Sequence, residues 1–152
     1  MGYDVVVEVV QAQLLAAVRV TVPLGEAGRA WKPALDQVWA FLREASDVQP
    51  GHNLILYHHP AVRGEPLEVD VGVQVSRRFE PAGAVHSVET PSGEVATTVH
   101  LGPYDQLGQA HAAIHAWCLA HERTVGRASW ETYGDWTADP AALETTISYL
   151  LA

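Results

Sequence analysis

Alternating apolar and polar positions predict β-strands at corresponding places in the two halves of the chain. Residues 13–22 carry β-branched side chains at every second position (Val18, Val20 and Val22), and residues 94–101 repeat this alternation. Four short runs bounded by turn-forming residues are also expected to be strands, namely 53–58, 67–77, 128–134 and 143–151. Val5–Val10 is expected to form a first strand.

Two stretches have the three- and four-residue spacing of amphipathic helices. The first covers about 30–45 and places Leu35, Val38, Trp39 and Leu42 along one face. The second covers about 106–121 and does so with Leu107, Ala110, Ile114 and Trp117, together with Cys118 or His121. Trp39 and Trp117 are expected to pack into the core, where the same rings could also line a cleft.

The second half of the chain repeats the first. Val18–Leu24 aligns with Thr98–Tyr104 at an offset of 80 residues, which places Pro23 opposite Pro103. Trp39 aligns with Trp117 at an offset of 78. At an offset of 76, Tyr57 aligns with Tyr133 and Leu67–Val69 aligns with Leu143–Thr145. The small drift in offset is typical of loop deletions between copies of one module.

This repeat predicts an α+β fold in which a strand-helix-strand-strand module is duplicated. The halves, about 1–78 and 84–152, are joined by turn formers at 79–83 that are too few for a flexible linker. Neither half could bury its apolar face alone. We therefore expect a single domain over residues 1–152, with an antiparallel sheet, a pseudo-twofold axis and a central ligand cleft along that axis.

Composition narrows the class of partner. The formal net charge of −9 disfavours direct binding to nucleic acid, because phosphates are held by Lys and Arg. No apolar stretch of about 18 residues is present to span a bilayer, so no membrane association is expected. The N-terminus lacks a basic leader and a small-residue cleavage site, which favours a cytoplasmic location. Cys118 has no second cysteine to pair with and is expected to be buried.

The run Trp130–Trp136 carries the most informative chemistry. With period two, Glu131, Tyr133 and Asp135 face one way, while Trp130, Thr132 and Trp136 face the other. The repeat counterpart of Glu131 is Ile55, so the duplicated scaffold does not need an acid there. A carboxylate among aromatics would attract a cation, or act as a general acid or base if burial shifted its pKa. A solvated glutamate on an edge strand is the structural alternative.

Other candidate chemistry is weaker. His111 and His115 have the i, i+4 spacing of a metal-binding helix face, but Ala112 follows where a zinc-protease helix has Glu, and no third ligand is nearby. We therefore expect no metal and no cofactor. His58 and His59 end a strand, at an exposed turn or a pocket rim. The chain has no Gly-x-Ser-x-Gly elbow and no phosphate-binding loop.

Several of these segments together resemble the GyrI-like small-molecule-binding family, which includes effector domains of bacterial multidrug-sensing regulators. The matching features are Glu94–Tyr104, the spacing to Trp117, the run Trp130-Glu131-x-Tyr133 and the closing Thr145-x-Ile147-x-Tyr149-Leu150. The resemblance implies the duplicated fold, an aromatic cleft and a pocket glutamate at Glu131, with Tyr104 and Tyr149 at positions resembling pocket tyrosines. Because the chain begins directly with this domain, it is expected to be a stand-alone member.

Two functions of different class follow from this resemblance. The leading one is binding or sequestration of bulky hydrophobic, aromatic or cationic small molecules in an acidic aromatic pocket. The expected ligand-binding residues are Glu131, Tyr104, Tyr149, Tyr133, Tyr57, Trp39, Ile55, Trp117 and Trp136. The second is a hydrolase that opens the strained ring of cyclopropanoid DNA-alkylating natural products, with Glu131 and Tyr133 (or Tyr104) as catalytic residues. Docking onto a larger protein partner is a third possibility.

The two halves are expected to contribute unequally to such a pocket. Trp39, Ile55 and Tyr57 of the N-terminal half would supply shape, while the C-terminal half supplies charge and hydrogen bonds. Two facing carboxylates in one cleft would raise at least one pKa and cost several kcal/mol, so a single acid against an apolar wall is the more stable way to hold a cation.

Overall fold

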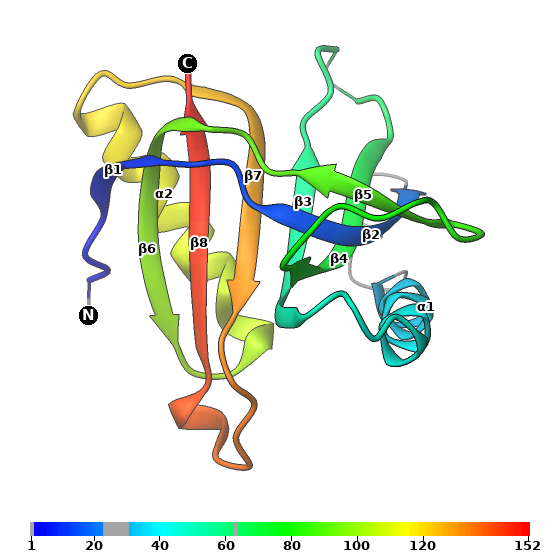
Figure 1. Ribbon diagram of the computed structural model, residues 1–152. Helices are drawn as coiled ribbons and strands as arrows, with labels where there is room; N and C mark the ends of the chain where they lie inside the picture. The colour runs from blue at the N-terminus through cyan, green and yellow to red at the C-terminus, as the bar shows by residue number, and fades with distance from the viewer. Residues whose placement is uncertain (1, 23–30, 63) are drawn as a thin grey trace.

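The computed structural model describes residues 2–22, 31–62 and 64–152 (Figure 1). Its elements follow in the order β1 (Val6–Val10), β2 (Leu14–Val22), α1 (Trp31–Glu44), β3 (Pro50–His58), β4 (Leu67–Val75), β5 (Val85–Glu89), β6 (Gly93–Leu101), α2 (Leu107–Ala120), β7 (Val125–Tyr133) and β8 (Glu144–Leu151). Short 3-10 turns lie at Tyr104–Gln106 and Pro140–Ala142. Within the described residues, neither helix is long and apolar enough to cross a bilayer.

The strands of the described residues form one antiparallel sheet in the order β1-β6-β8-β7-β3-β4-β2-β5. If each of β1 to β4 is exchanged for its counterpart among β5 to β8, the result is the same strand order read from the other end. This is the pattern of a pseudo-twofold axis between β3 and β7. The α+β class and the duplicated strand-helix-strand-strand module are therefore confirmed. Each half also carries one additional strand before the module, and the sequence predicted β1 but not β5.

The two helices bury equivalent positions. Ala34, Val38 and Leu42 of α1 are buried, and so are Ala110, Ile114 and Cys118 of α2, each 76 residues further on. The expected alignment of Trp39 with Trp117 at an offset of 78 is therefore wrong, because the helix face that packs on the sheet repeats at 76. Trp39 corresponds to His115 instead. Cys118 is buried and free, as expected.

The helices cover one face of the sheet. In Figure 1, α2 lies behind β6, β8 and β7, and its buried residues join a core with Ile147 and Tyr149 of β8. A corresponding core forms between α1 and the first half, around Val38, Ile55 and Val71. Because successive strand residues point to opposite faces, Ile55 and Glu131 lie on the helix side of the two central strands.

A third apolar cluster fills the opposite face of the central strands. Leu54 and Leu56 of β3 pack there with Trp130 of β7, and all three are buried. Burying a side chain of this size stabilises the fold by roughly 1.5–3 kcal/mol. The alternation predicted for the run from Trp130 therefore holds along β7, with the indole on one face of the sheet and Glu131 on the other.

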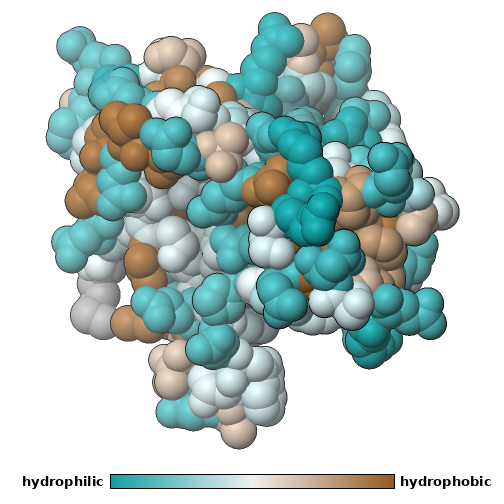
Figure 2. All heavy atoms as spheres, in the orientation of Figure 1, coloured by the Kyte–Doolittle hydropathy of each residue, from teal (hydrophilic) through white to brown (hydrophobic). Residues whose placement is uncertain are grey.

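The surface carries both polar and apolar residues, with a hydrophobic patch at one edge of the sheet. Figure 2 shows it over the region of β1, where Val6, Val7 and Val9 are exposed. Pro23 and Leu24, which the repeat aligned with Pro103 and Tyr104, lie outside the described residues.

Candidate functional site

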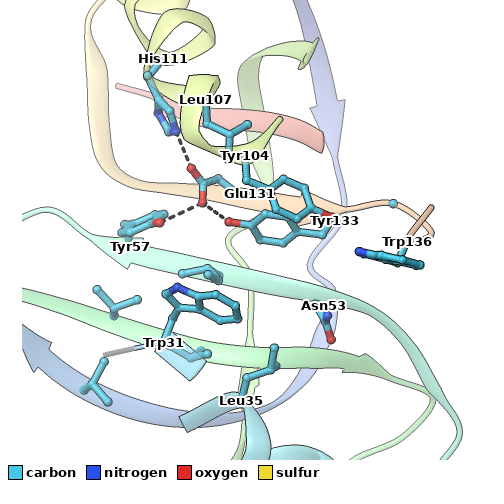
Figure 3. A pocket seen from close by; sticks show the side chains of 16 residues that line it. Trp31, Leu35, Asn53, Tyr57, Tyr104, Leu107, His111, Glu131, Tyr133 and Trp136 are labelled. Atoms are coloured by element: carbon cyan, nitrogen blue, oxygen red, sulfur yellow. Dashed lines mark hydrogen bonds and ion pairs between the residues drawn. The ribbon is translucent and has the colours of Figure 1, made fainter. Parts of the chain in front are cut away.

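A cavity of about 580 Å³ lies over the seam of β3 and β7, between the N-terminal parts of α1 and α2 (Figure 3). The first half contributes mainly an apolar wall made of Val20, Trp31, Leu35, Ile55, Val69 and Val71. Aromatic and polar groups come largely from the second half, as Tyr104, His111, Glu131, Tyr133 and Trp136. The lining is therefore unequal between the halves even though the scaffold is duplicated.

Glu131 lies at the centre of the cavity floor. It projects from β7, which is flanked by β3 and β8, so the alternative of a solvated glutamate on an edge strand is wrong. Glu131 is only 5% exposed to solvent. Oε1 accepts hydrogen bonds from the hydroxyls of Tyr57 at 2.9 Å and Tyr133 at 2.6 Å, and Oε2 lies 2.6 Å from Nε2 of His111.

These three partners keep the Glu131 carboxylate charged. Burial favours its neutral form. The hydrogen bonds from His111 and Tyr133, the electrostatic attraction of His111 and the hydrogen bond from Tyr57 together outweigh burial and lower the pKa of Glu131. Burial, and then the negative charge of Glu131, raise the pKa of both phenols. At neutral pH the floor therefore presents a carboxylate held by two neutral phenol donors and by the ring of His111.

His111 extends the hydrogen bonding away from the cavity. Its Nδ1 lies 2.7 Å from the hydroxyl of Tyr149 on β8. Burial raises the pKa of Tyr149 to about 12, although a hydrogen bond with Ser129 opposes this shift. Glu131, His111 and Tyr149 thus form a continuous chain from the cavity floor into the core beneath α2. Tyr149 belongs to this chain and is not among the residues that line the cavity.

Both helix tryptophans expected at the pocket lie outside its lining. Trp39 donates its indole N–H to Oδ1 of Asn53 at 2.9 Å, and Asn53 itself lines the cavity. Trp117 stacks on His121 with ring centroids 4.2 Å apart, one turn from the end of α2. Trp39 therefore orients a lining residue, whereas the structure gives Trp117 no contact with the cavity.

Aromatic side chains surround the cavity opening. Tyr104 meets Tyr133 edge to face, with ring centroids 5.3 Å apart, and is 39% exposed. Trp31 begins α1, and Trp136 follows the end of β7 with 75% of its surface exposed. Because β7 ends at Tyr133, the alternation expected up to residue 136 stops there, and Trp136 lines the cavity from a loop (Figure 3).

The sequence singled out Glu131, Ile55, Tyr57, Tyr104, Tyr133 and Trp136, and the structure brings these six residues together around one cavity. The sequence prediction did not identify His111, Trp31 or Asn53 as lining residues. His111 could have been found from the repeat, because at an offset of 76 its counterpart is Leu35 and the histidine is an unneeded polar replacement. Within the described residues, no group of His, Cys, Asp and Glu is arranged to hold a metal ion.

A buried carboxylate on the central seam of a duplicated antiparallel sheet, beneath an aromatic-lined cavity, defines a class of small-molecule-binding domain. The family model described as the GyrI-like small molecule binding domain matches residues 3–148, and the chain belongs to this family. None of the curated protein sequences matches the chain.

Solved structures with the same fold have low sequence identity. The EcmrR C-terminal domain superposes with a TM-score of 0.83 at 19% identity, over 100% of this chain and 99% of that one. SAV2435 bound to tetraphenylphosphonium gives 0.70 at 15%, covering 100% and 94%. A hydrolase from Listeria innocua gives 0.69 at 14%, covering 99% and 93%. At these identities the likeness shows the fold alone.

Proposed function

We propose that this chain, as a single domain over residues 1–152, binds bulky hydrophobic molecules that are aromatic or cationic, with Glu131 as the opposing charge. The observation that carries the proposal is a charged, buried carboxylate on the floor of an otherwise apolar and aromatic cavity. A volume of about 580 Å³ is within the range of sites for drug-sized ligands. Multidrug binding or sequestration is the role that fits such a site.

Two physical effects favour a cation in this cavity. Coulomb attraction to Glu131 is strong because low-dielectric walls surround the carboxylate. The faces of Trp31, Tyr104 and Trp136 each add cation–π attraction of roughly 0.5–2 kcal/mol where a ligand charge reaches them. One structural relative is described as bound to tetraphenylphosphonium, a bulky aromatic cation, which supports this choice of ligand.

A titration with methyltriphenylphosphonium, a bulky aromatic monocation, tests the proposal. Glu131→Gln keeps the shape of the side chain and removes its charge, so affinity should fall at least roughly tenfold. Glu144→Gln is the matched control, because Glu144 is exposed outside the cavity and the substitution changes net charge equally. Equal losses in the two variants would mean that overall charge, and not the Glu131 site, attracts the cation.

A hydrolase is the second candidate, and the contact of Glu131 with His111 favours it. A carboxylate and an imidazole 2.6 Å apart can accept a proton from water and return it later. The water oxygen would bond to a carbon of a strained cyclopropane while the ring C–C bond breaks toward a conjugated carbonyl. Tyr133 or Tyr104 would donate a hydrogen bond to the developing oxyanion, and reprotonation would complete the net addition of water.

Mass spectrometry separates these two functions. Incubation with a cyclopropane fused to a cyclohexadienone should yield a product heavier by one water if the protein is a hydrolase, and Glu131→Gln should abolish this product. Recovery of unchanged compound in complex with the protein would support binding alone.

A further inference from the structure

Three polar residues of the second half replace apolar residues at equivalent places in the first. Glu131 corresponds to Ile55, His111 to Leu35 and Tyr149 to Val73, in each case at an offset of 76. The same offset relates the buried faces of α1 and α2. Leu35 and Ile55 line the cavity and Val73 is buried, so the scaffold is complete without any of the polar groups.

These three residues form a single hydrogen-bonded chain. Glu131 Oε2 is 2.6 Å from Nε2 of His111, and Nδ1 of His111 is 2.7 Å from the Tyr149 hydroxyl. An isolated polar replacement in the core would leave a buried group without a partner, which costs about 1–3 kcal/mol. Within the chain both ring nitrogens of His111 have a partner, one in Glu131 and one in Tyr149, which indicates that the three residues act as a unit.

The chain accommodates His111 both neutral and protonated. In the neutral form, the Nε2–H donates to Glu131 and Nδ1 accepts the proton of Tyr149. In the charged form, both ring nitrogens donate and the Tyr149 oxygen accepts. Since the pKa of Tyr149 is raised to about 12, this hydroxyl is present throughout the pH range in which histidines change charge. Protonation of His111 then requires no more than reorientation of one O–H bond.

The charge state of His111 decides the net charge next to the ligand. With a neutral imidazole, Glu131 gives the floor one negative charge that a cation can balance. With an imidazolium, the floor is neutral, and a cation would add an unbalanced charge in an apolar cavity. We propose that His111 is a specificity-determining residue: an aromatic cation binds in exchange for its proton, whereas a neutral ligand binds in either state.

The other titratable groups around His111 would not make this exchange. Tyr149 faces it from β8, and Tyr57 and Tyr133 share Glu131 with it from β3 and β7; burial raises the pKa of all three phenols. His115 lies one turn further along α2 and His59 follows β3, each beside the Tyr149 ring. Burial, and then neighbouring histidines, lower the pKa of both, so each keeps its neutral form to a lower pH than an ordinary histidine does.

The inference rests on the proposed binding function, so its test uses two probes. Methyltriphenylphosphonium is the cation, and triphenylphosphine oxide is a neutral molecule of similar shape. Calorimetric titration between about pH 5 and 8 in buffers of different ionisation enthalpy gives both affinity and protons exchanged. Cation affinity should fall by up to roughly tenfold per pH unit toward the acid end, with release of up to about one proton. The neutral probe should show neither effect.

Two variants assign the proton to its residue. His111→Gln keeps a donor toward Glu131 and an acceptor toward Tyr149 but does not titrate, so it should bind the cation without proton release. His115→Gln is the control, because His115 is on the same helix outside the cavity lining, and it should release protons as the wild type does.

The outcomes separate the inference from the function beneath it. Binding of both probes by the wild type without proton exchange would overturn the role of His111 and leave the binding function intact. Proton release that persists in His111→Gln would also overturn it, because the proton would come from another group. Failure of both probes to bind at any pH would overturn the binding function and this inference with it.

Discussion

Ile55 of β3 lies directly opposite Glu131 of β7, and the two are also equivalent positions of the duplicated halves. Residues that are both paired and equivalent mark the point where the pseudo-twofold axis crosses the sheet. Tyr57 and Tyr133 are related by the same axis, and both donate to Oε1 of Glu131. A symmetric pair of donors therefore serves one carboxylate, and the side chain at position 55 decides whether a second charge faces it.

Ile55→Glu should create two facing carboxylates and destabilise the protein by roughly 2–4 kcal/mol at neutral pH. One of the two would have a raised pKa in the folded state. The electrostatic penalty is absent below the pKa of a glutamate in the unfolded chain and grows as pH rises above that value. Urea unfolding at about pH 4 and pH 8 measures this difference, with Ile55→Gln as the uncharged control. A loss of stability in Ile55→Glu that did not grow with pH would contradict the geometry.

Tyr57→Phe and Tyr133→Phe should each cost roughly 1.5–3 kcal/mol of unfolding free energy at neutral pH, because each removes a hydrogen bond to a charged group. The lowered pKa of Glu131 contributes stability above the unfolded pKa that is lost as pH falls. Removing a donor raises the folded-state pKa of Glu131 toward its unfolded value, so each variant has less stability to lose, and its difference from wild type should shrink as pH falls through the unfolded pKa. The cost of each substitution should shrink in a Glu131→Gln background, and an unchanged cost would show that packing is responsible.

Ile55→Ala and Glu131→Ala should change ligand preference differently. The isoleucine contributes shape to the cavity wall, so its truncation should weaken cationic and neutral aromatic ligands by similar factors. Truncation of the glutamate removes the charge, so cations should lose far more affinity than neutral analogues. Titrating one cation and one neutral probe into both variants gives the two ratios. The same ranking of ligands in both variants would argue against an unequal division between the halves.

A buried ion pair on the other face of β4 should control acid stability. Asp70 is fully buried, and its two oxygens accept hydrogen bonds from Arg19 at 3.0 and 2.7 Å. Burial opposes its ionisation, but hydrogen bonds from His58 and Arg19 lower the pKa of Asp70 to about 2. Asp70→Asn should cost about 2–3 kcal/mol at neutral pH, less than a fully buried pair, because Arg19 is partly exposed.

The pH dependence of this cost has a defined sign. The Asp70 contribution is present above its unfolded pKa of about 4 and is lost as pH falls toward 2. The difference in unfolding free energy between wild type and Asp70→Asn should therefore narrow over this interval. Lys32→Gln, at an exposed pair with Asp36, is a control whose effect should be small at every pH. A difference that stays constant down to pH 2 would refute the assignment.

Much of the fold was predictable, because the spacing of apolar residues along the sequence identifies strands and helices that bury one face. β5 was not, since Val85 and Val88 are three residues apart and do not alternate as a strand would. Its existence depends on pairing with β2, from Leu14 to Val18, a contact made only in the folded chain. The same limit applies to any short strand whose partner lies far away in sequence.

The site residues on one strand were predictable, because alternation fixes the direction of their side chains. The site residue on a helix was not, because its position depends on how the helices align between the two halves. Alternation along β7 placed Glu131 and Tyr133 on the same face. His111 was missed because matching Trp39 to Trp117 shifted the helices by two residues, which hid its correspondence to Leu35. Identical residues were a poor guide here, since one indole bonds Asn53 and the other stacks on His121. Buried positions recur at a constant offset because the scaffold, not residue identity, was retained.

The outer strands give the chain an interlocked topology. β1 belongs to the first half but pairs with β6 of the second, while β5 belongs to the second half and pairs with β2 of the first. Each half thus completes the sheet of the other, and cleavage in the segment 79–84 would leave fragments that must reassociate to recover these pairings. A chain with a single half would satisfy them by exchanging its first strand with another copy, as a domain-swapped homodimer.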